Sequence, residues 1–349
     1  MKILYGVQGT GNGHIARARA MSHAFKSHDV QVDFLFSGRA PEKYFSMEDF
    51  GDYQTRRGFT FITHKGAVNY TKTALQNNLI QFCKEVNQLD LSSYDLVLND
   101  FEPVTAWAAR KQKKPCIGIS HQNAFRYPVP LKGASWLDKS VIQHFAPSQH
   151  YLGLHWYHFD QPLLPPIVHT NNNQTNNDNF VLVYLPFESI EDIGDLLFHF
   201  NQQSFICYHP DVIEPEHIEN IELRPLSHTD FQHHLHQCSG VIANGGFELP
   251  SEALSLGKKL LLKPLSGQFE QQSNVATLEE LGLAMSMGSL DISTVRLWLK
   301  EQQAESVRYP DVAQAIAQWV LQGEWDSQEM LSKQLWEQVD FPSYVSPNL

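Results

Sequence analysis

The chain has 349 residues, of which 42% are hydrophobic and 18% are charged, and its formal net charge at pH 7 is −12. This is the composition of a globular protein in water, and the length suits two domains of about 150–200 residues rather than one core. The excess of acidic side chains argues against a nucleic-acid partner, because its phosphates would be repelled and no long Lys/Arg run opposes the repulsion.

The sequence also bears on location and redox state. The segment MKILYGVQGTG enters a strand at once, without an apolar signal core or a cleavage site, so we expect a cytoplasmic protein. No apolar run approaches the ~20 residues that span a bilayer, and we expect no transmembrane segment. Because no C-x-x-C pair occurs, we expect four buried, reduced cysteines: Cys83, Cys116, Cys207 and Cys238.

The first half of the chain alternates strands with helices. The patterns predict strands at 2–7, 30–37, 59–63, 96–98 and 115–120, and helices at 14–25, 70–89 and 103–111. Such alternation predicts a parallel sheet covered on both faces, and ligands of these sheets bind at the carboxyl ends of the strands. Residues 8–14, 99–102 and 120–123 should therefore share one rim of the sheet.

A glycine-rich segment, GTGNGH, follows the first strand and opens a helix. It differs from a dinucleotide-binding fingerprint, because His14 stands where the third glycine would allow close helix packing. The acidic residue that should follow the second strand is Asp33, which lies inside it. We therefore expect neither a nicotinamide nor a flavin cofactor, and instead a loop for acceptor or phosphate: Thr10, Gly11, Asn12 and Gly13.

Two segments before the middle of the chain admit two interpretations each. Residues 120–130 (SHQNAFRYPVP) follow a strand and can contact a ligand, or they can form a rim loop turned by prolines. Residues 134–158 are apolar and aromatic, which suits core packing or a membrane-facing patch for a lipid-linked acceptor. The segment lacks the Lys/Arg face of membrane-surface helices, which favours core packing.

The segment NNNQTNNDN (171–179) has low complexity and no side chains suited to packing, so it predicts a linker between domains. Strand–helix alternation resumes after it, and the last ~45 residues have helical spacing. The expected organisation is an N-terminal domain at 1–170, the linker at 171–179, a C-terminal domain at 180–325 and a C-terminal helix at 326–349.

A histidine cluster, LSHTDFQHHLHQ, lies in the second half of the chain. Its spacing matches no common metal motif, and on a helix His233 and His236 share a face that His234 does not. We therefore expect a solvated helix and no metal site. The place of residues 226–229 relative to the glycine turn described next suggests contacts with a base or a ribose.

The most informative stretch is NGGFELPSEALSLGKKLLLKPLSGQFEQQSN (244–274). Gly245 and Gly246 follow an apolar run and open a short helix, whose free backbone N–H groups and positive dipole end suit a diphosphate. Glu252, one and a half turns into this helix, can accept two hydrogen bonds from a vicinal diol such as a ribose. Glu270 and Gln271 follow the next strand and can reach a sugar ring. Diphosphate, ribose and hexose together make a nucleotide-sugar.

This order of residues resembles the donor-binding signature of GT-B glycosyltransferases, both the plant-type glucosyltransferases and the peptidoglycan lipid-intermediate N-acetylglucosaminyltransferase. It is most similar to a bacterial and archaeal family with GG-x(5)-EALSLGK and GQFEQ runs. The resemblance implies an α/β GT-B fold, with two Rossmann-like domains facing across a cleft. Asn244 replaces the signature's His, Pro250 replaces a hydroxyl residue, and the base-stacking Trp expected near Leu226 is absent. The implied donor-binding residues are Gly245, Gly246, Glu252, Glu270, Gln271 and Asn274.

The Gly13–His14 pair matches a Gly-His dipeptide of both groups, and in the plant-type enzymes this His is the general base. Sugar transfer with inversion needs such a base within hydrogen-bond reach of an acceptor hydroxyl. An orienting carboxylate would fix the tautomer of the ring. Asp100 is the first candidate for that partner and Glu102 the second, although the acid can instead be the base itself. His14 can alternatively line the cleft or cap its helix.

The resemblance therefore implies an inverting hexosyltransferase that uses a nucleotide-diphosphate-sugar, with a UDP-sugar as the expected donor. It implies no metal and no further cofactor, because the helix dipole and backbone N–H groups replace Mg²⁺ at the leaving diphosphate. The acceptor is a glycan, a lipid-linked molecule or a small molecule, held by the N-terminal domain. Two alternatives stay open: a nucleotide-sugar epimerase, and a non-catalytic nucleotide-sugar-binding protein.

Overall fold

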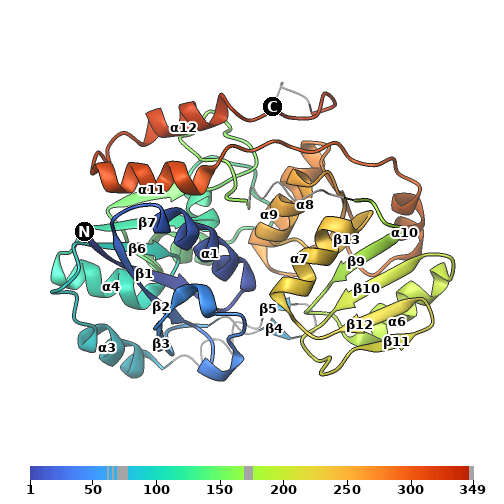
Figure 1. Ribbon diagram of the computed structural model, residues 1–349, viewed down its shortest axis with the longest axis horizontal. Coiled ribbons are helices and arrows are strands. Elements are labelled where there is room, and N and C mark those ends of the chain that lie inside the picture. Colours follow the sequence, from blue (N-terminus) through green and yellow to red (C-terminus); the bar gives the residue numbers. More distant parts are fainter. Residues whose placement is uncertain (61–62, 65–66, 69–77, 169–175, 346–349) are drawn as a thin grey trace.

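The computed structural model describes residues 1–60, 63–64, 67–68, 78–168 and 176–345. Two parallel sheets stand side by side, each covered by helices on both faces (Figure 1). The predicted pair of doubly wound parallel sheets is confirmed. No helix in these residues is both long and apolar enough to cross a membrane.

The first sheet has six strands in the order β3-β2-β1-β6-β7-β8, and every neighbouring pair is parallel. Six of the seven residues of β1 are buried, as befits a central strand covered on both faces. The strands are β1 (Lys2–Gln8), β2 (Gln31–Ser37), β3 (Gln54–Arg56), β6 (Leu96–Asp100), β7 (Cys116–Ser120) and β8 (His150–Gly153). The helices around them are α1 (Asn12–Lys26), α3 (Leu79–Gln88), α4 (Pro103–Gln112) and α5 (Trp136–His144), and a separate pair joins β4 (Thr63–His64) to β5 (Ala67–Val68).

The second sheet has seven strands in the order β11-β12-β10-β9-β13-β14-β15, and only the edge pair β11–β12 is antiparallel. Its centre is apolar and buried, and β13 contributes five buried residues. The strands are β9 (Phe180–Tyr184), β10 (Ser204–Tyr208), β11 (Glu216–Ile218), β12 (Ile221–Arg224), β13 (Gly240–Asn244), β14 (Lys259–Lys263) and β15 (Met285–Ser286). The helices are α6 (Ile190–Leu197), α7 (His228–Gln237), α8 (Glu248–Ser255), α9 (Phe269–Glu280) and α10 (Ile292–Leu299).

Some predicted elements differ from the structure. In the strand predicted at 59–63, Phe59 and Thr60 are not part of a strand, residues 61–62 lie outside the described part, and Thr63 begins β4. The strand that pairs with β2 is β3, and the helix predicted at 70–89 is described only from Leu79. Asn78 precedes this helix and its side chain accepts a hydrogen bond from Gln81 N, which is the bond of an N-cap. Residues 69–77 lie outside the described part. Cys83 is exposed, so the prediction of four buried thiols was wrong for that residue.

The end of the chain returns to the first domain. Helices α11 (Val312–Gln322) and α12 (Gln328–Trp336) lie above the first sheet in Figure 1, and α11 packs against α1. Ser332 Oγ and Trp336 Nε1 both donate hydrogen bonds to the carbonyl of Leu163, at 2.6 and 2.7 Å. The returning part therefore includes α11, which precedes residue 326. We retain the domain limits given above as a proposal, and residues 169–175 lie outside the described part.

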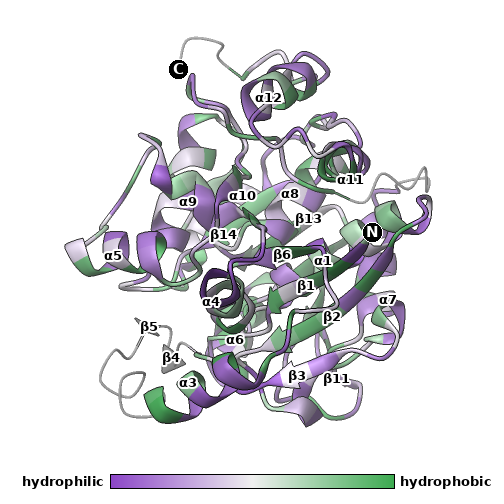
Figure 2. Ribbon diagram, turned by 90° about the vertical axis from the view of Figure 1, so that its left-hand side faces the viewer, coloured by the Kyte–Doolittle hydropathy of each residue, from purple (hydrophilic) through white to green (hydrophobic). Residues whose placement is uncertain are grey.

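The sheet interiors are hydrophobic where the strands cross the middle of each domain. Figure 2 shows this for β1 and β6, whose ribbons are mostly hydrophobic. Gly6 lets β1 approach α4, since a Cβ at this position would lie 1.9 Å from Thr105 Oγ1. The same threonine donates from its hydroxyl to Glu102. A side chain on Gly6 would therefore disturb both the core and the start of α4.

We expect Gly6→Ala to lower the free energy of unfolding by about 1–3 kcal/mol, which is the usual cost of overpacking a core. Gly288→Ala is the matched control, because no atom lies within 4 Å of the Cβ position there. Thermal unfolding of both variants beside the parent protein measures the effect. Equal melting temperatures for the two variants would contradict the close approach of β1 and α4.

Candidate active site

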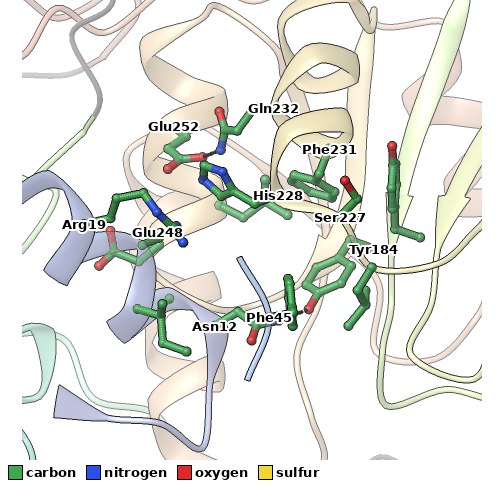
Figure 3. A pocket seen from close by; sticks show the side chains of 16 residues that line it. Asn12, Arg19, Phe45, Tyr184, Ser227, His228, Phe231, Gln232, Glu248 and Glu252 are labelled. Atoms are coloured by element: carbon green, nitrogen blue, oxygen red, sulfur yellow. Dashed lines mark hydrogen bonds between the residues drawn. The ribbon is translucent and has the colours of Figure 1, made fainter. Parts of the chain in front are cut away.

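A pocket of about 750 Å³, including the open solvent at its mouth, lies between the two domains. Helix α1 forms one wall, and the ends of β9 and β10, the start of α7 and the first turns of α8 form the other (Figure 3). Glu252 and Gln232 lie at one end of the pocket, and Tyr184 and Ser227 lie at the other. The lining residues are Asn12, Gly13, Ile15, Ala16, Arg19, Phe45, Tyr184, Tyr208, Leu226, Ser227, His228, Phe231, Gln232, Glu248, Leu249 and Glu252.

His14 and Asp100 come together at this domain boundary. His14 lies in the first turn of α1, Asp100 is the last residue of β6, and Nδ1 of the ring is 2.8 Å from Asp100 Oδ1. The carboxyl group is fully buried, whereas 14% of the His14 side chain is exposed. An ionised carboxylate only accepts hydrogen bonds, so Nδ1 carries a proton, and in the neutral ring Nε2 is then the nitrogen with the lone pair. The pair therefore has the geometry of an oriented imidazole base.

Arg17, which the sequence analysis did not select, keeps Asp100 ionised. Its Nε donates to Asp100 Oδ2 at 2.7 Å, and its side chain is 2% exposed. Burial alone would raise the pKa of Asp100, but the Arg17 charge and the bond from His14 outweigh it and lower this pKa. The one available signal was the spacing, because Arg17 follows His14 by three residues and so shares its face of the helix.

Glu102, the other candidate partner of His14, has a structural role. Its carboxylate caps α4 by accepting from the backbone N–H groups of Val104 and Thr105, at 2.8 and 2.6 Å. Ser37 Oγ donates to the same group at 2.6 Å. Burial raises the pKa of Glu102, although these hydrogen bonds oppose the rise. The structure therefore brings Asp100, and not Glu102, to His14.

The paired glycines form the turn between β13 and α8. A Cβ on Gly245 would lie 2.7 Å from Val275 Cγ2 and 2.9 Å from the Gln271 carbonyl, so this glycine lets α9 pack closely. Gly246 is partly exposed, and no atom lies within 4 Å of its Cβ position. The N-cap residue Phe247 offers no side-chain bond to the helix. The first N–H groups of α8 thus have no side-chain cap, which suits an anion.

Glu248 is the first residue of α8 and was also absent from the sequence-based selection. Its side chain is 8% exposed, and Oε1 lies 2.9 Å from Arg17 Nη1, across the domain boundary. Burial raises the pKa of Glu248 to about 8; Arg17 opposes this rise, while Asp100 and Glu252 add to it. Arg17 stays charged, since its pKa is raised by Asp100 and Glu248 against the effect of burial. The Glu248 carboxyl group therefore loses its proton only at about pH 8.

Glu252, for which the sequence predicts a ribose contact, lines the pocket. Its Oε2 accepts a hydrogen bond of 2.9 Å from Gln232 Nε2 on α7 (Figure 3). Leu226, Ser227 and His228 line the same pocket, which is where the sequence analysis expected base or ribose contacts. Among the described residues, no group of three or more His, Cys, Asp or Glu side chains is arranged to hold a metal ion.

The three predicted donor residues on α9 do not line this pocket. Glu270 Oε1 accepts from Gln122 Nε2 at 3.0 Å, which links α9 to the rim of the first domain. Gln271 is buried, and its Oε1 accepts from Leu265 N at 2.9 Å. Asn274 is buried, and its Nδ2 donates to the Gly245 carbonyl at 3.0 Å. Asn274 therefore supports the glycine turn from beneath.

The predicted loop at the start of α1 divides into two parts. Asn12 and Gly13 line the pocket, and Asn12 Nδ2 donates to the Tyr184 hydroxyl across the cleft at 3.1 Å (Figure 3). Thr10 and Gly11 lie outside the lining, and Thr10 Oγ1 accepts from Gln8 Nε2 at 2.8 Å. The loop therefore meets the second domain through Asn12 and Gly13.

The two ambiguous segments both contain interdomain contacts. His121, in the short helix η3 (His121–Arg126), lies with its Nε2 2.6 Å from Asn274 Oδ1. Trp156 is buried and donates to Ser251 Oγ of α8 at 2.9 Å, as core packing of its segment predicts. Trp136, in the same aromatic segment, is 76% exposed. Packing therefore accounts for only part of residues 134–158.

The sequence matches the model of a family described as glycosyl transferase family 1 over residues 1–301, and the chain belongs to this family. It is thus a nucleotide-sugar-dependent glycosyltransferase with the GT-B fold. None of the curated proteins compared with the sequence matches it.

Solved GT-B glycosyltransferases have the same fold. Phytolacca americana UGT2, complexed with UDP-2fluoro-glucose and pterostilbene, is 13% identical with a TM-score of 0.59, over 97% of this chain and 98% of that one. The kitacinnamycin glycotransferase is 12% identical with a TM-score of 0.58, over 96% and 97%. VinC in complex with DTDP is 12% identical with a TM-score of 0.52, over 97% and 98%. At these identities the likeness concerns the fold.

The burial of Glu248 predicts a pH dependence of stability. Its pKa is raised in the folded protein to about 8, so its contribution is fully present below the unfolded value near 4.5 and is lost as the pH rises to about 8. The loss amounts to at most about 1.4 kcal/mol per pH unit. Glu248→Gln cannot ionise and removes this loss. We expect the melting temperature of the variant to rise relative to that of the parent as the pH increases from 5 to 8. A difference that stays constant over this range would contradict the assignment.

Proposed function

We propose that the protein transfers a hexose from a UDP-sugar to an acceptor hydroxyl, with inversion and without a metal ion. The observation that carries this proposal is the bond of 2.8 Å between His14 Nδ1 and Asp100 Oδ1 at the domain boundary, next to the pocket that Glu252 lines. The acceptor is a hydroxyl of a glycan, a lipid-linked molecule or a small molecule presented by the N-terminal domain. The cytoplasmic location stays a prediction.

In the proposed reaction, His14 Nε2 removes the proton of the acceptor hydroxyl while its oxygen attacks the anomeric carbon. The bond from this carbon to the diphosphate oxygen breaks, and the diphosphate leaves with the electron pair. Asp100 stabilises the imidazolium that forms. Backbone N–H groups at the start of α8 and the dipole of this helix offset the charge of the leaving group. These contacts replace the role that a cation would have.

In this proposal the donor binds along the second domain. The diphosphate lies at Gly245 and Gly246, the ribose hydroxyls bind Glu252, and the base lies against Leu226 and its neighbours. Tyr184 and Phe231 supply aromatic surface in the same pocket, in place of the missing Trp. The glycosyl group extends toward Glu270 and Gln271. UDP is the first choice and dTDP the second, because two of the similar structures hold these nucleotides.

His14→Ala should lower kcat by about 10²–10⁴-fold, because a general base contributes about that much. The variant should keep its donor affinity, since His14 is not among the residues that line the pocket proposed for the ribose and the base. A panel of UDP-, GDP- and dTDP-sugars in a thermal-shift assay first identifies the donor. Turnover is then measured as free nucleoside diphosphate released only when an acceptor is added, which distinguishes transfer from epimerisation. His23→Ala, on the exposed part of the same helix, is the control. Full turnover in His14→Ala would refute the assignment of the base.

Glu252→Gln should weaken donor binding about 10–100-fold, because a charge-assisted pair of hydrogen bonds to the ribose is lost. The effect on kcat at saturating donor should be smaller, since the ribose does not react. Calorimetric titration with the free nucleoside diphosphate measures the affinity. Glu280→Gln, an exposed change on α9, provides the comparison. Equal affinities for the two variants would exclude a ribose contact at Glu252.

A further inference from the structure

The Arg17 side chain contacts three segments of the chain. It lies on α1 with His14, its Nε bonds Asp100 at the end of β6, and its Nη1 pairs with Glu248 on α8 of the other domain. Its Nη2 lies 3.2 Å from His14 Nδ1. One guanidinium therefore contacts the base, the carboxylate that orients the base, and the helix assigned to the donor.

The chemistry of these groups fixes what Arg17 does to the base. A guanidinium only donates hydrogen bonds, and His14 Nδ1 already donates to Asp100, so the approach of Nη2 to Nδ1 places two donors face to face. This approach is tolerable because the Asp100 carboxylate accepts from both side chains, through Oδ1 and Oδ2. The position of Arg17 thus determines how the carboxylate is turned toward the imidazole.

The contact with Glu248 depends on how closely the two domains approach. A Cβ on Gly13 would lie 2.9 Å from Glu248 Cγ, so α1 and α8 are as close as a glycine permits. Any separation of the helices would take Glu248 away from Arg17. The same short helix carries Glu252 into the pocket. The position of α8 therefore affects Asp100 through one side chain, that of Arg17, which contacts both Glu248 and Asp100.

We propose that Arg17 is a positioning residue for the His14 base, and that Glu248 completes this arrangement only when the donor domain is closed against α1. Domain closure then completes the orientation of His14. In an open enzyme, Asp100, which orients the imidazole, is held less rigidly. This inference rests on the proposed function, and it adds a link between donor-domain docking and base orientation.

Tyr5, Glu252 and His121 face the cluster. Burial lowers the pKa of His121, and the Arg17 charge adds to this effect. Tyr5 on β1 is buried beside Asp100, Arg17 and Glu248, and its pKa is raised by burial, so it is neutral. Glu252 faces Glu248 from one turn further along α8. With Asp100 ionised and Arg17 charged, Glu248 decides whether the three carry no net charge or one negative charge. Removing Arg17 leaves Asp100 alone to hold a proton on His14.

The first measurement does not depend on enzymatic activity. Nitrogen-15 NMR of the histidine rings reports the His14 tautomer in the parent protein, Arg17→Gln, Glu248→Ala and Ser251→Ala. The control Ser251→Ala removes a different interdomain bond of the same helix, the one that Trp156 Nε1 donates at 2.9 Å. We expect the Nδ1–H form in the parent and in the control. The His14 signals should change in Arg17→Gln and, across the domain boundary, in Glu248→Ala.

The second measurement is the dependence of kcat on pH, with the donor identified in the thermal-shift assay. Arg17→Gln should lower kcat about 10–10³-fold, as expected for a misplaced base, and change the KM for the donor less than about threefold. Its acidic limb should move to higher pH, because Asp100 is no longer opposed by a cation. Glu248→Ala should move the same limb less far and in the opposite direction, to lower pH, because the Arg17 charge then lacks one of its two carboxyl partners. The control should leave the limb where it is in the parent.

Each outcome decides the inference. If Arg17→Gln lowers kcat without moving the limb or the His14 signals, Arg17 is only structural and the proposal fails. If Glu248→Ala leaves both unchanged, the link between the domains is refuted. If Ser251→Ala reproduces the effects, general loosening explains them and the proposal fails. Arg17→Gln leaves Asp100 buried without its cation and can fail to fold, in which case Glu248→Ala alone decides. Absence of transfer with every donor would refute the proposed function, while the NMR reading would still test the arrangement.

Discussion

The approach of α1 to α8 is the constraint on which the site depends. Gly13 permits it, and Arg17 meets Glu248 across it, with Arg17 Nη1 2.9 Å from Glu248 Oε1. The same approach places the His14–Asp100 pair next to the pocket that Glu252 lines. A lone carboxylate at the end of β6 would tend to neutralise by protonation, and it stays ionised here because Arg17 reaches it.

The sequence predicted the two sheets because their central strands are continuous apolar runs between turn signals. It also located the glycine turn and the helix that carries Glu252, since both depend on local patterns. The choice between Asp100 and Glu102 was open although a local signal existed. Glu102 precedes Pro103, and an acid before a proline at the first helical position indicates an N-cap.

Arg17 and Glu248 could not be found from sequence in the same way. Their pairing joins residues that are far apart in the chain. Judged from its neighbours in the sequence alone, each is an ordinary polar residue of an amphipathic helix. The roles of Asn274 and Gln271 are hidden for a similar reason. Their side chains bond backbone groups of neighbouring turns, at the Gly245 carbonyl and at Leu265 N, and such bonds depend on how the elements pack.

The charge of Glu248 connects the fold to the proposed chemistry. A carboxylate in the first turn of α8 would repel a diphosphate bound at the same helix end, and would offset part of what the helix dipole contributes. Burial raises the pKa of this group to about 8, so near neutral pH it is largely protonated, and Arg17 lies against it. The burial of Glu248 against α1 thus keeps the helix end suitable for an anion.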